Sequence, residues 1–193
     1  MSDPVRSGTT RRTLLNTIAG VSAASLVAPR AGVAADEPAK MRPQPGDVLV
    51  FAQGERKGQP IVAADLPLAD DPVLAYPKDP VADLVRDGSR LNQLIVVRLD
   101  PAALSEETAE HAAEGVVAYS AICTHQNCPV SMWKSSNETL YCSCHGTQYD
   151  PRKNAEVVDG PAPRRLAALP LEIKDGMLVA AGELTGGVGS KKL

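Results

Sequence analysis

All four cysteines and two of the three histidines of this chain lie within a stretch of 23 residues. The first group is Cys123, His125 and Cys128, and the second is Cys142, Cys144 and His145. In each group a thiol and an imidazole are two or three positions apart, so one tight loop can aim both side chains at a metal. The sequence therefore predicts a metal centre built from two loops, and the fold must bring these loops together.

Short apolar runs separated by turns indicate a β-protein. The chain has 15 Gly and 16 Pro residues but only six aromatic residues, a composition rich in turns. We expect strands at residues 48–51, 94–99 and 116–122, and a hairpin in which residues 169–173 and 177–181 flank an Asp-Gly turn. The Ala, Leu and Glu residues of 101–114 predict one surface helix that Gly115 ends.

The first 35 residues have the pattern of an export signal. The adjacent Arg11 and Arg12 precede an apolar stretch that reaches Ala28, and small residues precede Asp36. The apolar stretch of about 15 residues is short for a bilayer span, which needs roughly 20. We therefore predict a twin-arginine-type signal and a periplasmic protein. Two alternatives are an uncleaved anchor in the inner membrane and a disordered basic tail before a buried helix.

The remaining chain divides into three predicted parts. Residues 36–46 contain three prolines and no apolar period, so we interpret them as a linker. Residues 47–185 are predicted to form one folded domain, and residues 186–193 a flexible tail. The formal charge of -3 and the scattered basic residues give no support for nucleic-acid binding.

The spacing of Cys123, His125, Cys142 and His145 resembles the ligand pattern of Rieske [2Fe–2S] proteins. The resemblance implies one cluster per chain, in which the two cysteines bind one iron and the two histidines bind the other. It also implies an all-β Rieske fold, an antiparallel sheet sandwich with a small cluster-binding subdomain and one short surface helix. The histidines are then expected to face solvent.

Cys128 and Cys144 match the extra cysteine pair of the high-potential branch of that family. The resemblance implies that they form a disulfide between the two cluster loops. A disulfide is compatible with export, because an oxidising compartment lets it persist.

Further matches surround the ligands. Thr147 and Tyr149 occupy positions where family members have hydroxyl donors to a bridging sulfide and to a cysteine sulfur, and such donors raise the reduction potential. Gly160, Pro161, Ala162 and Pro163 resemble the proline loop that covers the cluster in quinol-oxidising members. Asn127 replaces the usual Gly but tolerates a left-handed backbone, and polar Gln126 replaces an apolar residue, which disfavours quinol docking.

These features suggest an electron-transfer subunit rather than an enzyme that works alone. The first hypothesis is the small subunit of an arsenite-oxidase-type enzyme, with a catalytic subunit as electron donor and a c-type cytochrome as acceptor. The second is the Rieske subunit of a membrane quinol:cytochrome c oxidoreductase, which requires a retained anchor. A zinc-stabilised interaction module is the alternative from another class. An oxygenase is excluded, because only His111 remains for a second iron site.

Overall fold

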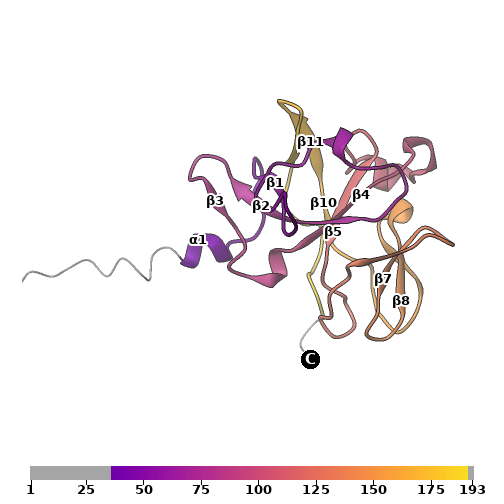
Figure 1. The fold of residues 1–193 in the computed structure, drawn as a ribbon. Helices are drawn as coiled ribbons and strands as arrows, with labels where there is room; N and C mark the ends of the chain where they lie inside the picture. Colours follow the sequence, from indigo (N-terminus) through magenta and orange to yellow (C-terminus); the bar gives the residue numbers. More distant parts are fainter. Residues whose placement is uncertain (1–35, 191–193) are drawn as a thin grey trace, which may run out of the picture. The chain divides into compact units, whose positions relative to one another are not determined.

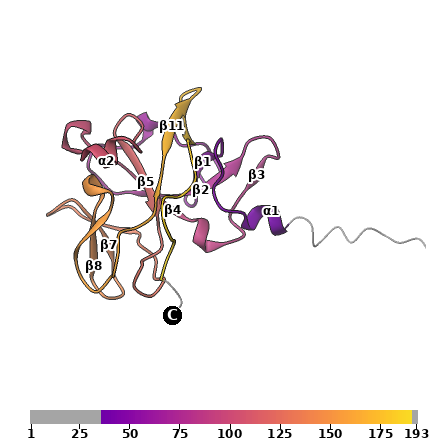
Figure 2. The ribbon, with the colours of Figure 1, turned by 180° about the vertical axis from the view of Figure 1, so that it is seen from behind.

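Two antiparallel sheets make up most of the fold in this computed structural model, which describes residues 36–190 (Figures 1 and 2). The predicted export signal, residues 1–35, and the last three residues of the predicted tail lie outside the described residues. Within the described range, none of the helices has the length and apolar character needed to cross a bilayer. The all-β fold class expected from the sequence is confirmed.

The larger sheet, which we call the base sheet, has eight strands in the order β10-β5-β4-β2-β1-β12-β11, with β3 added alongside β2. Its strands are β1 (Val48–Phe51), β2 (Val73–Asp79), β3 (Leu84–Val85), β4 (Leu94–Arg98), β5 (Val116–Ser120), β10 (Ala168–Leu169), β11 (Leu171–Lys174) and β12 (Met177–Ala180). The predicted hairpin is confirmed as β11 and β12, whose turn residues Asp175 and Gly176 both have positive φ.

The smaller sheet belongs to the segment between β5 and β10. It has the order β6-β7-β8-β9 and consists of β6 (Met132–Lys134), β7 (Thr139–Cys142), β8 (Thr147–Asp150) and β9 (Glu156–Asp159). We call residues 121–167, which contain this sheet and its loops, the tip. In both ribbon views β7 and β8 lie beside the base sheet (Figures 1 and 2).

Strands β4 and β5 connect the two cores. Alternate side chains of a strand point to opposite faces, and in these two strands both faces are buried. Ile95, Val97 and Tyr119 pack into one apolar core with the tip. Leu94 and Val96 pack into a second core with β1 and β12. The chain runs from buried β5 directly into Cys123, so the first cluster loop starts on a rigid strand.

The helices are short. They are α1 (Asp36–Lys40), α2 (Glu106–Ala109) and the 3-10 turns η1 (Ala63–Asp65), η2 (Arg90–Asn92), η3 (Pro101–Ala103) and η4 (Pro151–Lys153). The expectation of one helix over 101–114 was therefore wrong in extent. Leu104 is extended, the Ser105 amide donates to the Arg152 carbonyl (2.9 Å), and the Ser105 side chain caps α2. These competing hydrogen bonds divide the segment.

Residues 36–46, expected to be a linker, contain α1 and are hydrogen-bonded to the segment between β3 and β4. Asn92 donates through Nδ2 to the Met41 carbonyl at 2.6 Å, and Arg86 donates to the Pro38 carbonyl at 3.1 Å. Arg86 is itself held in a buried ion pair with Asp47, with Nε 2.7 Å from Oδ2. Composition alone did not reveal these contacts, because the partners lie some 40 to 50 residues away along the chain.

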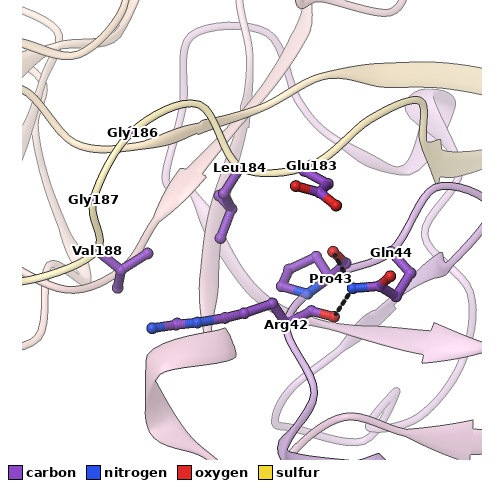
Figure 3. A pocket seen from close by; sticks show the side chains of 8 residues that line it. All are labelled: Arg42, Pro43, Gln44, Glu183, Leu184, Gly186, Gly187 and Val188. Atoms are coloured by element: carbon purple, nitrogen blue, oxygen red, sulfur yellow. Dashed lines mark hydrogen bonds between the residues drawn. The ribbon is translucent and has the colours of Figure 1, made fainter.

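A pocket of about 390 Å³ lies between the segment before β1 and the segment after β12 (Figure 3). Its lining residues are Arg42, Pro43, Gln44, Glu183, Leu184, Gly186, Gly187 and Val188. Gln44 Nε2 donates to the carbonyls of Arg42 and Pro43, which fixes one wall. The pocket shows that residues preceding and following the base sheet lie side by side.

Candidate metal centre

The structure brings together the two thiols predicted as ligands. Cys123 follows β5 and Cys142 ends β7, and both are buried and free. Burial raises the pKa of the Cys142 thiol, and its hydrogen bond with the Cys123 thiol raises it further. The backbone amides of Cys144 and His145 lower that pKa because they donate to the same sulfur. The centre thus holds two adjacent sulfurs, one of which already has amide donors.

The two predicted imidazole ligands also meet. The rings of His125 and His145 are 4.7 Å apart between centroids and make an angle of 82°. His125 is half-buried and His145 is exposed. The Nδ1 atom of His125 is buried without a hydrogen-bond partner. A buried imidazole nitrogen without a hydrogen-bond partner is unfavourable. A metal ion bound to this nitrogen would remove that cost, so the orientation of the His125 ring fits a metal ligand.

Cys128 and Cys144 form the disulfide that the family resemblance implied. The bond joins the two cluster loops, with the two Cα atoms 6.5 Å apart. The sulfur atoms of Cys128, Cys142 and Cys144 lie within 4.8 Å of one another. Since two of these three sulfurs are paired with each other, Cys123, Cys142, His125 and His145 remain as the donor set.

The side chain of Tyr149, on β8, contacts the first cluster loop. Its hydroxyl oxygen is 3.2 Å from Cys123 Sγ and accepts a 3.3 Å hydrogen bond from the Thr124 amide. Burial raises the pKa of Tyr149 far above its ordinary value, so the hydroxyl keeps its proton at neutral pH. Tyr149 is therefore placed within hydrogen-bond distance of the sulfur for which the family resemblance implied a hydroxyl donor.

Thr147 starts β8, and its Oγ1 is fully buried with no hydrogen-bond partner. Gly160 presses against it: a Cβ on Gly160 would lie 2.5 Å from the Thr147 Cα and 2.9 Å from Oγ1. Gly160 also has a φ of 91°. Both this backbone conformation and the close contact with Thr147 therefore disfavour any side chain at this position. The proline loop that follows exposes Pro161 and Pro163 and buries Ala162.

Three contacts at the first loop were missed by sequence reasoning. Thr124 donates through Oγ1 to the Arg164 carbonyl at 2.6 Å, Arg90 donates to the Asn127 carbonyl, and Asn127 exchanges hydrogen bonds with Ser190. The only sequence signal was the position of Thr124 between two ligands. The other partners are far apart in sequence and carry no motif.

The donor set fits an iron–sulfur cluster. The two loops carry two buried thiols, two imidazoles in edge contact, and two buried polar atoms without hydrogen-bond partners. Thiolates and imidazoles are the ligands of [2Fe–2S] centres with mixed ligation. The fold and the site thus define a cluster-binding electron-transfer domain.

Comparison with known proteins agrees with this class. The family model "Rieske [2Fe-2S] domain" matches residues 85–170. The chain is 37% identical over 98 residues to the cytochrome bc1 complex Rieske iron-sulfur subunit of Streptomyces lividans, covering 50% of this chain and 58% of that protein. It is 38% identical over 97 residues to the putative respiratory nitrate reductase subunit Rieske of Haloferax mediterranei, covering 50% of this chain and 43% of that protein.

Solved structures give weaker likenesses. The ferredoxin of carbazole 1,9a-dioxygenase from Nocardioides aromaticivorans overlaps 64% of this chain and 95% of its own, with a TM-score of 0.43 and 17% identity. The plasma membrane Rieske protein from Synechocystis overlaps 62% of this chain and 93% of its own, with a TM-score of 0.40 and 23% identity.

Residues 85–170 match a Rieske [2Fe–2S] domain, and the chain is distantly related to the Rieske subunits of bc1 complexes. Its cofactor is a Rieske [2Fe–2S] cluster. The match spans little more than half of the Streptomyces lividans subunit and 28% of the corresponding subunit of Streptomyces coelicolor.

Proposed function

We propose that this protein is the electron-transfer subunit of an exported oxidoreductase complex. It would accept one electron from a catalytic or quinol-oxidising subunit and pass it to a c-type cytochrome. The observation that carries the proposal is the exposure of His145 at the tip, in edge contact with the His125 ring. An exposed ligand shortens the path between the cluster and a docked partner.

In this proposal Cys123 and Cys142 hold one iron, and His125 and His145 hold the other. When bound, the cluster takes up and releases one electron at a potential raised by its neutral imidazole ligands. Tyr149 donates to the Cys123 sulfur, and the unpaired Thr147 hydroxyl can donate to a sulfide. Both donors favour the reduced, more negative state.

The parent complex has two candidates. Exposed Gln126, next to His125, supports a polar docking face and favours the small subunit of an arsenite-oxidase-type enzyme. The disulfide, the Gly160–Pro163 loop and the bc1 relatives favour the Rieske subunit of a quinol:cytochrome c oxidoreductase. One relative is named as the Rieske subunit of a nitrate reductase, whereas others are named as Rieske subunits of bc1 complexes. This variety supports the general proposal of an electron-transfer subunit, whichever of the two complexes contains it.

We also propose that residues 1–35 direct the protein to the periplasm by the twin-arginine route. Adjacent arginines before a short apolar stretch support the route, and the disulfide is compatible with an oxidising compartment. Sequencing the N-terminus of the exported protein separates the two candidate complexes. A start near Asp36 in all the material contradicts the anchored quinol-oxidising subunit.

The decisive experiment is a low-temperature electron paramagnetic resonance spectrum of the dithionite-reduced protein, with iron, sulfide and zinc analysis. A rhombic signal with a low average g value and two irons per chain is expected. Zinc without iron would refute the proposed ligation and leave the zinc-stabilised module. Co-purification of the native complex then identifies the donor subunit.

A further inference from the structure

The turn that carries His125 is closed by Asn127, a residue in the left-handed conformation with a φ of 59°. The Asn127 amide donates to the Cys123 carbonyl at 3.1 Å, which closes the turn on the ligand side. The Asn127 carbonyl accepts from the guanidinium of Arg90, in η2. The main chain between His125 and Cys128 is therefore held by the loop itself and by the guanidinium of Arg90.

The side chain of Asn127 is held by a different segment. Its Nδ2 donates to Ser190 Oγ at 2.8 Å, and its Oδ1 accepts from the Ser190 amide at 2.7 Å. This reciprocal pair connects residues 63 positions apart. We call residues 187–190, which make this contact, the brace.

Gly189 shows how closely the brace approaches the cluster loop. Its φ is 65°, and a Cβ there would collide with Asn127 Oδ1 and lie 3.1 Å from Ile122 Cγ2. Only glycine fits in this place without displacement of the Asn127 side chain. Gly186, which directly precedes the brace, has a φ of 93°, but a Cβ there would meet no atom within 4 Å.

Arg164 joins the brace to the third loop of the site. Its guanidinium donates to the carbonyls of Gly187 and Gly189. Its own carbonyl accepts from Thr124 Oγ1, between the ligands Cys123 and His125, at 2.6 Å. The brace thus binds the Arg164 guanidinium, while the Arg164 carbonyl holds the same loop whose turn the brace supports through Asn127.

We propose that the brace is a positioning element of the redox centre, which holds the His125 turn closed and keeps the Arg164 cation beside the cluster. The inference rests on the ligation proposed above. A nearby fixed cation favours the reduced, more negative cluster, and a supported ligand loop is less free to open. The brace therefore raises the reduction potential and slows opening of the loop.

The matched test compares Gly189→Ala with Gly186→Ala in the full-length protein carrying its cluster. Both variants place a methyl group at a positive φ, but only Gly189→Ala pushes against Asn127. We expect Gly189→Ala to lower the reduction potential measured by redox titration. Amide hydrogen exchange of residues 124–128 should become roughly tenfold faster, which corresponds to about 1.4 kcal/mol. Gly186→Ala should leave both quantities at the wild-type values.

Two milder variants keep the test decisive if Gly189→Ala does not retain the cluster. Ser190→Ala removes one bond of the reciprocal pair, and Asn127→Gly removes the side chain but keeps the left-handed turn. Both should shift the potential in the same direction, and adding Gly189→Ala to Asn127→Gly should have little further effect. Two outcomes would contradict the proposed role of the brace. One is that the reduction potential and the amide exchange rate stay unchanged in both Ser190→Ala and Gly189→Ala. The other is that Gly186→Ala changes both quantities as much as Gly189→Ala does.

The exchange comparison is repeated on protein from which iron has been removed. If wild-type protein shows no rhombic signal, the proposed ligation is refuted, and faster exchange in Gly189→Ala alone still supports the contact between brace and loop. A normal wild-type signal with no difference among the variants refutes the brace and leaves the ligation intact.

Discussion

The base sheet and the tip are stabilised in different ways. The core of the base sheet consists of aliphatic side chains from strands at both ends of the described range, including Leu49, Leu94 and Leu178, all fully buried. The core shared with the tip contains the free thiols of Cys123 and Cys142, and Thr147 beside it has an unpaired hydroxyl. Apolar burial is the main stabilising contribution in the base sheet, whereas the tip also contains a disulfide, and we expect it to depend on its cofactor.

This difference means that the tip can be damaged while the base sheet persists. The largest expected effect is on cofactor retention. His145→Gln removes one predicted ligand from an exposed position and should abolish cluster binding, measured as iron and sulfide per chain. The control is His111→Gln, since His111 lies beyond α2 and is bound through its backbone carbonyl to Leu171. Equal cluster content in both variants would contradict the ligand assignment.

The buried ion pair between Arg86 and Asp47 is a polar contribution to the stability of the larger sheet region. Removing it tests whether that region depends on apolar burial alone. The side chains of Arg86 and Asp47 are only 5% and 3% exposed. Asp47→Asn leaves the guanidinium with Asp79 alone and should lower the free energy of unfolding by about 3 to 5 kcal/mol, measured by urea titration.

The matched control is Asp65→Asn, which disrupts an ion pair with Arg56 on the surface, where the side chains are 27% and 43% exposed. This change should cost less than about 1 kcal/mol. If Asp47→Asn costs no more than Asp65→Asn, the base sheet depends on apolar burial alone.

The disulfide should matter for the tip and little for the base sheet. The double variant Cys128→Ala with Cys144→Ala removes a bond that spans 16 residues, a loop for which about 3 kcal/mol is expected. Trp133, the single tryptophan, lies in β6, so its fluorescence reports unfolding of the tip. Slow exchange of the β4 and β5 amides should persist. Loss of that protection would show that the two regions unfold together.

The smallest expected effect concerns the potential. Tyr149→Phe removes the hydroxyl next to Cys123 Sγ and should lower the reduction potential by about 60 mV, equivalent to about 1.4 kcal/mol. Tyr141→Phe is the control, because the Tyr141 ring lies under Lys134 rather than against a free thiol. A potential unchanged in Tyr149→Phe would exclude this hydroxyl as a donor.

Local sequence patterns predicted the elements that depend on local chemistry. Strand β1 was predicted with its observed bounds, and β4 and β5 differ from expectation only at their ends. Residues 65–90 mix Pro and Asp with Val and Leu and have no clear apolar period, so their sequence predicts no strand, yet they contain β2 and β3. The reason is that β2 includes Pro77 and pairs over short stretches, with β4 through Val73–Ala75 and with β1 through residues 75–78. Only the neighbouring strands make this segment a strand.

The candidate site shows the same difference between features that local sequence patterns predict and features that depend on long-range contacts. The spacing of the cysteines and histidines predicted which side chains form the site, and the structure brings the two free thiols together and the two imidazoles together. The contacts that hold the first loop from outside, from Arg90, Arg164 and Ser190, were not predictable. They are single long-range hydrogen bonds, which leave no periodicity and no motif. The segment predicted as a flexible tail illustrates the consequence, because its Ser190 is hydrogen-bonded to Asn127 of the first cluster loop, and its Gly187 and Gly189 carbonyls accept from Arg164.

The order of the strands has a consequence for modularity. The tip leaves the base sheet after β5 and returns at β10, and these two strands are hydrogen-bonded neighbours. The Ser120 amide donates to the Ala167 carbonyl at 2.8 Å, so the two ends of the tip adjoin. Topologically, the tip is an insertion into a β-hairpin. Such a unit can be transplanted between hairpins, or replaced by a short turn, without changing the order of the strands that carry it.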